Sequence, residues 1–304
     1  MLKNLLYANA FVTLLDSVKK EATSFDEKLP LFLFLLYNMC MKKRKQFNEL
    51  TIQDDFMFCK VMQNMSICKQ VLQLVLEEKN IHIKKISAQH TIENASEIKS
   101  VRLDVLAEDE KGNKFDIEMQ MVNNDRIPKR MRLYQATIDV YTMGKGMLYA
   151  DMPDTIIIFF CMFDPIGEEL PVYTFENTCQ EDKNIKLNDG TLKVIINVKA
   201  YEKVKNPELK GLLKYICDGI VTNSLTEEIE MNVSTIKENQ VFLKEYDSFY
   251  ARMQDEREEG RQEGIVEGRQ EGMLTTARRM KENNFDISTI IKITGLSKQE
   301  VEYL

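Results

Sequence analysis

Acidic and amide residues in two short alternating segments are the residues of this sequence best suited to chemistry. Asp104 lies in residues 101–107, and Glu118 and Gln120 lie in residues 114–121. Side chains alternate between the faces of a strand, so Glu118 and Gln120 share one face. Carboxylate oxygens suit a hard divalent ion such as Mg2+. A bound ion of this kind can polarise a phosphodiester and lower the pKa of a bound water, which Gln120 could orient without carrying charge.

The residues between the two segments predict which side chains face each other. Glu110-Lys111-Gly112 can form a three-residue hairpin loop, with Gly112 at the left-handed position that such loops prefer. Paired residue numbers then sum to 222, which places Asp104 across from Glu118, with Cβ atoms about 4.5–5.5 Å apart. Two carboxylates at that separation repel each other unless a cation bridges them. From the pattern alone, a solvent-facing hairpin with scattered acids is the alternative, and a two-residue loop would break the match.

Hydrophobic periodicity predicts the elements that must position this hairpin. Residues 155–163 are apolar on both faces, which predicts a central strand that is covered on both sides. The other expected elements are helices over residues 53–78 and 125–149 and strands over residues 81–86, 171–175 and 191–198. Together they predict an α/β domain over residues 46–205, with a mixed central sheet flanked by helices.

The remainder of the sequence is predicted to be helical. Residues 206–272 contain the dipeptide Glu-Gly at 259, 263, 267 and 271. Glycines every four residues share one helix face, so this region is either a glycine seam for self-association or a weakly helical charged spacer. Residues 273–304 resemble a small helix-turn-helix, with Asp286 capping one helix, Gly295 ending it, and Ser297 with Glu300 capping the last. Glu300 and Glu302 disfavour DNA contact by that last helix.

The composition narrows the chemistry. The chain has 304 residues, a net charge of −7, and two histidines, His82 and His90, which we interpret as structural. None of the six cysteines forms a CxxC pair, so a structural zinc site is not expected, and the cysteines fit reduced thiols of a cytoplasmic protein. Few bases are available to a serine or cysteine nucleophile. With a zinc site and a histidine-assisted nucleophile both disfavoured, chemistry performed by carboxylate side chains is the remaining possibility.

Residues 1–45 are expected to be an N-terminal extension. Their apolar run, residues 29–41, is shorter than the roughly 20 residues that a membrane helix needs, so no membrane segment is predicted. We interpret the run as a buried or poorly ordered helix. The alternative is that translation begins at Met39 or Met41.

Several ordered motifs resemble a known nuclease superfamily. The run Arg102-Leu-Asp-Val-Leu-Ala-Glu-Asp-Glu-Lys-Gly, followed by Asp116-Ile-Glu-Met-Gln, is similar to the PD-(D/E)XK nucleases. More specifically, the chain resembles the recombination-promoting nuclease/transposase family over about residues 46–304. The other matching stretches are Leu50-Thr-Ile-Gln-Asp-Asp-Phe-Met-Phe, Pro128-Lys-Arg-Met-Arg-Leu-Tyr-Gln, Phe163-Asp-Pro-Ile-Gly and Val172-Tyr-Thr-Phe-Glu-Asn.

The resemblance implies a Mg2+- or Mn2+-dependent DNA endonuclease that promotes recombination or is linked to mobile elements. It implies that Asp104, Glu118 and the carbonyl of Met119 bind the metal. Gln120 stands where the superfamily has lysine, which removes the usual charged activator of water. Asp55 matches the acidic residue that often completes such sites, although a helix N-cap role is an alternative for Asp54 or Asp55.

A basic cluster follows the second strand of the hairpin. Because the chain is acidic overall, any DNA contact must come from a local basic patch. Arg126, Lys129, Arg130 and Arg132 could contact phosphates beside the metal, and a solvated basic face is the alternative. Two other functions stay open: a nuclease-like fold that binds nucleic acid or a partner without cutting, and a scaffold assembled through the glycine-bearing helix.

Overall fold

The computed structural model describes residues 44–92, 101–123, 126–144 and 146–304. The chain divides into residues 1–46 and residues 47–304, and every described helix and strand lies in the second unit. The N-terminal extension predicted for residues 1–45 therefore lies outside the described residues, except for residues 44 and 45. The apolar run at 29–41 and the alternative starts at Met39 and Met41 lie outside them entirely.

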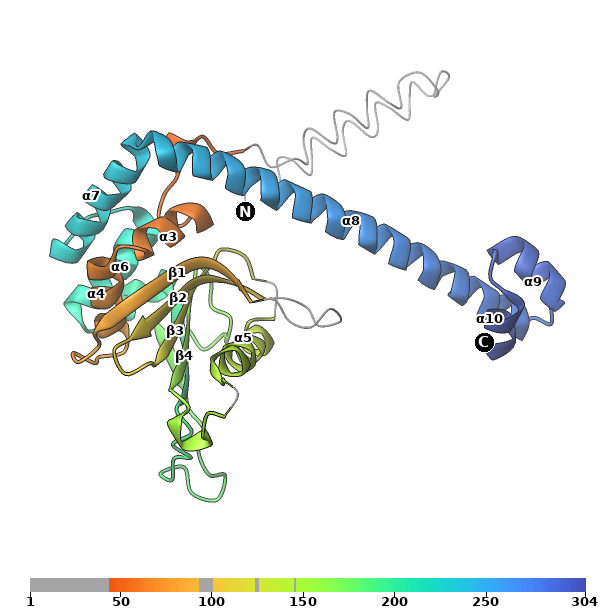
Figure 1. Ribbon diagram of the computed structural model, residues 1–304, viewed down its shortest axis with the longest axis horizontal. Helices are drawn as coiled ribbons and strands as arrows, with labels where there is room; N and C mark the ends of the chain where they lie inside the picture. The colour runs from red at the N-terminus through yellow and green to blue at the C-terminus, as the bar shows by residue number, and fades with distance from the viewer. Residues whose placement is uncertain (1–43, 93–100, 124–125, 145) are drawn as a thin grey trace. The chain divides into compact units, whose positions relative to one another are not determined.

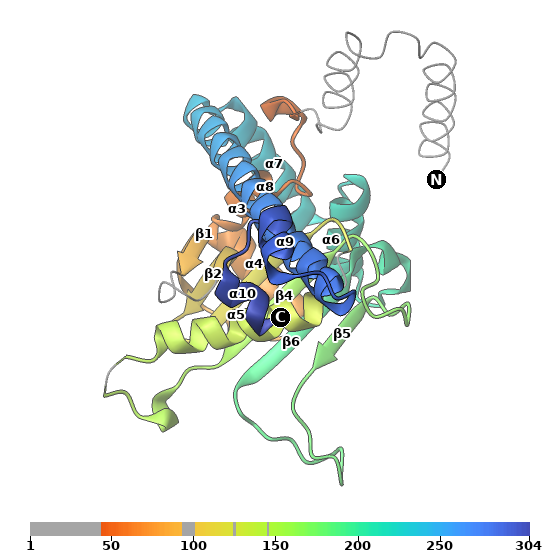
Figure 2. The same ribbon diagram turned by 90° about the vertical axis from the view of Figure 1, so that its right-hand side faces the viewer.

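A mixed six-stranded sheet forms the centre of the described unit (Figure 1). Its strands run in the order β1-β2-β3-β4-β6-β5, with parallel pairing of β3 with β4 and of β4 with β6, and antiparallel pairing elsewhere. The strands are β1 (Ile83–Ile92), β2 (Val101–Asp109), β3 (Lys114–Gln120), β4 (Thr155–Cys161), β5 (Val172–Phe175) and β6 (Thr191–Asn197). All residues of β4 are buried, so the predicted central strand is confirmed. In Figure 2, β5 and β6 lie together at one edge.

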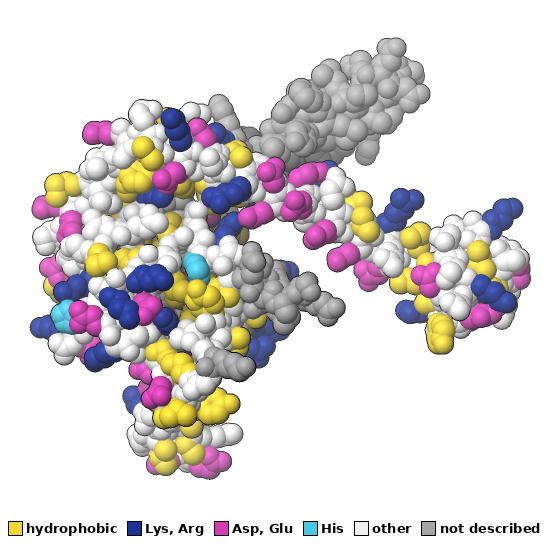
Figure 3. All heavy atoms as spheres, in the orientation of Figure 1, with side chains coloured by type: hydrophobic (Ala, Val, Ile, Leu, Met, Phe, Trp, Pro, Cys, Tyr) yellow, Lys and Arg dark blue, Asp and Glu magenta, His cyan; other side chains and the backbone are white. Residues whose placement is uncertain are grey.

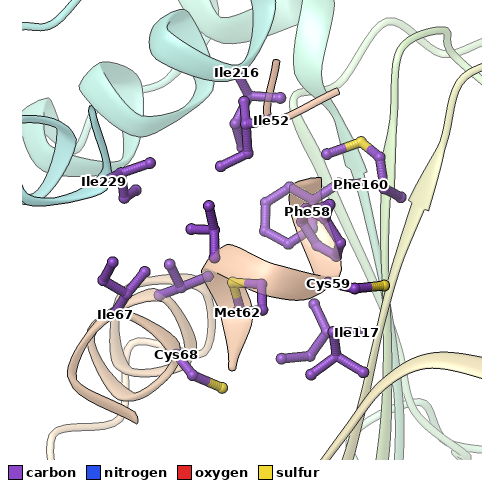
Figure 4. Packing of buried hydrophobic residues seen from close by; sticks show 14 of the residues in the cluster. Ile52, Phe58, Cys59, Met62, Ile67, Cys68, Ile117, Phe160, Ile216 and Ile229 are labelled. Carbon is purple, nitrogen blue, oxygen red and sulfur yellow. The ribbon is translucent and has the colours of Figure 1, made fainter. Parts of the chain in front are cut away.

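Helices cover both faces of this sheet. The helices α3 (Asp55–Met62), α4 (Met65–Val75), α6 (Pro207–Asp218) and α7 (Ser224–Glu238) bury their apolar sides in one cluster with β3 and β4. Figure 4 shows Phe58 of α3 beside Phe160 of β4, with ring centroids 6.2 Å apart. The helix α5 (Ile127–Thr142) covers the other face, where Ile127 and Met131 pack with Phe159. Burial of such side chains stabilises the fold by about 1.5–3 kcal/mol each.

Two predicted helices differ from the observed ones. Residues 53–78 form two helices, because the side chain of Asn64 accepts a hydrogen bond from the backbone N–H of Ser66 at 3.0 Å and starts α4. The helix expected over residues 125–149 ends at Thr142, shortly before Gly144 and Gly146. Three short 3-10 helices complete the elements of this part, η1 (Phe47–Glu49), η2 (Tyr149–Asp151) and η3 (Val198–Lys203).

The C-terminal part is helical, as predicted. The helix α8 (Gln240–Glu282) has 43 residues and buries Tyr246 and Phe249 against the core cluster. Farther along, it buries Ala277 in a separate small cluster with α9 (Ile287–Thr294) and α10 (Lys298–Tyr303). The predicted caps are confirmed: Asp286 accepts from Thr289 N–H, Gly295 ends α9 with a φ of 73°, and Ser297 forms a capping box with Glu300. None of the described helices combines the length and apolarity that crossing a membrane requires.

Candidate active site

The predicted hairpin register is confirmed. Backbone pairing of β2 with β3 joins Glu108 to Lys114 and Val105 to Ile117. The residue numbers of each pair sum to 222, as predicted. Gly112 has a φ of 93°, the left-handed conformation expected for this loop. The buried carboxylate of Asp109 accepts the backbone N–H groups of Lys111 and Asn113, each at 2.9 Å, which fixes the turn.

Backbone pairing between β2 and β3 stops at Val105 and Ile117, and carboxylates join the strands beyond that point. The backbone N–H of Asp104 donates to Oε1 of Glu118 at 2.8 Å. The backbone N–H of Met119 donates to Oδ2 of Asp104 at 3.1 Å. Each carboxylate therefore reaches across to the other strand, and the two acids lie together where the ladder opens. The alternative of a solvent-facing hairpin is wrong, because Glu118 is only 3% exposed.

A polar cavity of about 640 Å³ lies at this opening. It brings together side chains from α3, β2, β3, α5 and α8. The residues predicted for the site that line it are Asp55, Asp104, Glu118, Met119, Gln120 and Arg130. Lys129 and Arg132 of α5 and Arg126, the N-cap residue before α5, are exposed and do not line the cavity. The structure therefore separates Arg130 from the other three basic residues of that cluster.

Mutual proximity and burial make the acids hard to ionise. Burial, followed by the negative charge of Asp55, raises the pKa of Asp104 to about 7. Burial and the charges of Asp104 and Asp116 raise the pKa of Glu118 well above its ordinary value. Such acids gain from a neighbouring cation, which stabilises their charged forms.

Asp55 is the first residue of α3 and lies at the rim of the cavity. Its pKa is raised by burial and by the charge of Asp54. Asp54 occupies the N-cap position, yet its carboxylate accepts from the backbone N–H of Thr51 at 2.8 Å and makes no side-chain cap bond to α3. Asp55 therefore lies near Asp104, and because Asp54 holds the N-cap position, Asp55 can still be the acidic residue that completes the site.

Asp116, two residues before Glu118 in β3, is a buried acidic residue that does not line the cavity and that we did not single out from the sequence. It is fully buried in β3, and neither of its oxygens accepts a hydrogen bond from the described residues. Burial and the charge of Asp104 raise the pKa of Asp116 well above its ordinary value. Its alternation with Glu118 was the sequence signal that could have identified it.

Gln120 is held by a network around Arg130. Its side-chain oxygen accepts from Nη1 of Arg130, and its amide nitrogen donates to the carbonyl of Val122 at 2.8 Å. Arg130 also donates from Nη2 to Oε2 of Glu118 at 3.2 Å and to the hydroxyl of Tyr134 at 2.9 Å. Gln120 therefore contacts a cation, although it has no charge of its own.

Other residues near the cavity have structural contacts. Arg102 of β2 donates to both carboxylate oxygens of Glu256 in α8, each at 2.9 Å. The thiol of Cys59 in α3 donates to the backbone carbonyl of Asp104 at 3.3 Å, and burial raises its pKa well above the ordinary range. Neither histidine lines the cavity, and His90 packs edge-on against Tyr141.

The donor set suits a hard divalent cation. Within the described ranges, no three His, Cys, Asp or Glu side chains converge as a ready-made metal site. Two carboxylates with raised pKa values, Asp104 and Glu118, meet in a polar cavity beside the backbone of Met119. Mg2+ binds through one or two carboxylates and keeps several waters, so these residues fit it.

The mixed sheet, its flanking helices and the paired acids at the opening of β2 and β3 define an α/β fold of the PD-(D/E)XK type. The family model described as PD-(D/E)XK nuclease family transposase matches residues 52–263, more than half of the chain. The chain belongs to this family, which confirms the resemblance inferred from its sequence motifs. No curated protein and no solved structure matches it. Membership implies a phosphodiesterase and a DNA substrate.

Proposed function

We propose that this chain is a Mg2+- or Mn2+-dependent endodeoxyribonuclease, active in recombination or linked to mobile elements. The observation that carries the proposal is the pair of reciprocal bonds between Asp104 and Glu118 at the end of the hairpin ladder. These bonds bring two acids of raised pKa to one polar cavity in a chain that belongs to a nuclease family.

In this proposal Asp104, Glu118 and the backbone carbonyl of Met119 hold the metal, and Asp55 adds charge at the cavity rim. A bound divalent ion supplies Lewis acidity and lowers the pKa of a coordinated water. Hydrolysis would join the water oxygen to phosphorus as a P–O bond of the DNA backbone breaks, with the water's proton passing to solvent and the leaving oxygen taking up a proton. Arg126, at the start of α5, and Lys129 and Arg132 of α5 are exposed on the helix that also lines the cavity, and their charges can fix the phosphates of the bound strand.

Plasmid nicking with and without Mg2+ tests this proposal. The wild type is compared with Asp104→Asn and Glu118→Gln, because Asn and Gln can still accept the N–H groups of Asp104 and Met119 while losing the charge. Glu110→Gln removes one acid from the exposed hairpin loop and serves as the matched control. We expect metal-dependent cutting by the wild type and the control, and a loss of 100-fold or more, on the order of 3 kcal/mol, in both site variants. Equal cutting by all four proteins would reject the proposal.

A second candidate function is a nuclease fold that binds nucleic acid or a partner without cutting. The observation that favours it is that the oxygen and the nitrogen of the Gln120 amide are both hydrogen-bonded, to Arg130 and to Val122, and that position 120 holds no lysine to activate water. Retention of DNA by a wild type that never nicks it, at any Mg2+ or Mn2+ concentration, would support this alternative.

Self-association through the C-terminal helical region is a separate proposal. A Cβ added at Gly260, Gly264, Gly268 or Gly272 of α8 would meet nothing within 4 Å, so this helix face is open to a second helix. A mass that rises with concentration, and no longer rises after truncation at Gln254, would support assembly. The same mass at every concentration would reject it. A cytoplasmic location stays a prediction from the composition.

A further inference from the structure

We propose that Arg130 supplies the positive charge that Gln120 cannot carry, and that Gln120 is the positioning residue that holds Arg130 at the reacting phosphate. The proposal rests on the nuclease function above. It separates Arg130 from the DNA-contacting residues of α5 and gives it a part in the chemical step.

The position of Arg130 is fixed from several sides. Its guanidinium donates to Gln120 and Glu118 of β3 and to the hydroxyl of Tyr134, one turn farther along α5. The guanidinium carbon lies 5.2 Å from the ring centroids of both Tyr134 and Phe159. Cation–π contacts of this kind hold a guanidinium plane in one orientation.

The ion pair with Glu118 is one of several contacts that hold Arg130. It measures 3.2 Å, whereas Nη2 lies 2.9 Å from the Tyr134 hydroxyl. Gln120 and Tyr134 therefore hold the guanidinium even when Glu118 uses its oxygens elsewhere. Arg130 then keeps a full positive charge at the cavity, because arginine remains protonated in proteins.

The other basic residues near the site are arranged differently. Arg102 is the second described basic residue that lines the cavity, and it faces Glu256. Arg126, just before α5, and Arg132 within it are exposed and do not line the cavity. Arg130 is therefore the described cation that both lines the cavity and contacts a proposed metal ligand.

Phosphodiester cleavage concentrates negative charge on the phosphate oxygens in the transition state, and a preorganised guanidinium stabilises that charge. In the superfamily pattern a lysine occupies the position of Gln120. The amide in its place orients a neighbouring arginine, so the charge comes from α5 and not from β3.

Arg130→Gln is the central test, with DNA affinity and the single-turnover cleavage rate at saturating DNA measured separately at fixed salt. We expect the saturated rate to fall about 100-fold, with a much smaller change in affinity. Lys69→Gln removes the same charge from α4, on the opposite face of the sheet, and should leave both values unchanged. Arg132→Gln should mainly weaken binding.

Two further variants separate charge from structure. Gln120→Lys in the Arg130→Gln background returns a cation to β3 and should restore at least tenfold of the lost rate. Gln120→Ala combined with Arg130→Gln should be no slower than Arg130→Gln alone, because Gln120 acts through Arg130. If Arg130→Gln unfolds, Arg130→Met, which also removes the charge but keeps an apolar stem, gives the same comparison provided that it has wild-type thermal stability.

The outcomes separate this inference from the proposed function. A wild type that cuts DNA, together with Arg130→Gln cutting at the same saturated rate, would overturn the role of Arg130 alone. A loss of rate that Gln120→Lys does not restore would also overturn it. A wild type that does not cut with Mg2+ or Mn2+ would overturn the proposed function and this inference together.

Discussion

Asp104 carries a proton over much of the neutral range, because burial and Asp55 raise its pKa to about 7. A carboxylate must be deprotonated to bind a metal ion, so protons and Mg2+ compete for it. We expect the Mg2+ affinity to increase as the pH rises through about 7, by up to about tenfold per pH unit below that value. Calorimetric titrations with Mg2+ at pH 6 and pH 8 measure this, and proton uptake by the buffer should accompany binding at pH 6. An affinity that is equal at both pH values would contradict a role for Asp104 as a ligand.

Asp116 makes a separate prediction about stability. The pKa of Asp116 is raised in the folded chain, so the unfolded chain releases this proton at a lower pH than the folded chain does. The free energy of unfolding therefore decreases as the pH rises above about 4. Asp116→Asn removes that effect. The free energy of unfolding of the variant should therefore increase relative to the wild type between pH 5 and pH 8, by at most roughly 1.4 kcal/mol per pH unit. Urea unfolding without metal measures it, and a difference independent of pH would refute the explanation.

At the scale of elements, the hairpin loop sets the register on which the site depends. Gly112 has a φ of 93°, which side chains with a Cβ rarely adopt. Gly112→Ala should lower the free energy of unfolding by about 1–2 kcal/mol, as measured by urea unfolding. Gly144→Ala is the matched control, because Gly144 has no positive φ and an added Cβ there meets nothing within 4 Å. Equal losses in the two variants would show that backbone conformation is not the cause.

The elements predicted correctly from the sequence were those in which the alternation or the continuity of apolar side chains is sufficient to identify a strand. The alternation in residues 101–107 and 114–121 and the loop at Gly112 were sufficient to place Asp104 near Glu118. The doubly apolar run of β4 was recognised for the same reason. Burial of both faces leaves a strand no polar side, and that pattern is visible without a structure.

Elements that depend on tertiary contacts were predicted less well. The strand β1 continues to Ile92 although its last residues are mostly polar, because β2 pairs with it along that length. Arg130 lies at the edge of the apolar face of α5, next to the buried Met131. Periodicity could not show that this edge faces Glu118, because the packing of α5 on the sheet decides it.

At the scale of the whole described unit, α8 limits where DNA can lie. Residues 255–271 contain seven acidic and three basic side chains, and Figure 3 shows acidic groups along this helix. A surface of that charge repels the phosphate backbone. We therefore expect DNA to reach the cavity along α5, where Arg126, Lys129 and Arg132 are exposed, and the repeat of α8 to serve protein contacts.

Replacing the four glycines of the repeat by alanine tests that assignment. An added Cβ meets nothing at Gly260, Gly264, Gly268 or Gly272, and alanine favours a helix by about 1 kcal/mol per residue. We expect the variant to melt at a higher temperature and to self-associate less, because the added methyl groups hold a second helix away. Gln262→Ala with Gln270→Ala serves as the control on the same helix. A mass distribution equal to that of the wild type would contradict the glycine contact.

Asp104 and Glu118 meet two separate requirements, one for folding and one for the proposed chemistry. Folding needs an acceptor at positions 104 and 118, since each side chain takes a backbone N–H from the other strand. Asparagine and glutamine meet that need as well as the acids do. Only chemistry at a cation needs negative charge there. If the proposed nuclease function is correct, selection for cleavage would therefore keep acids at these positions, whereas selection for folding alone would also accept amides.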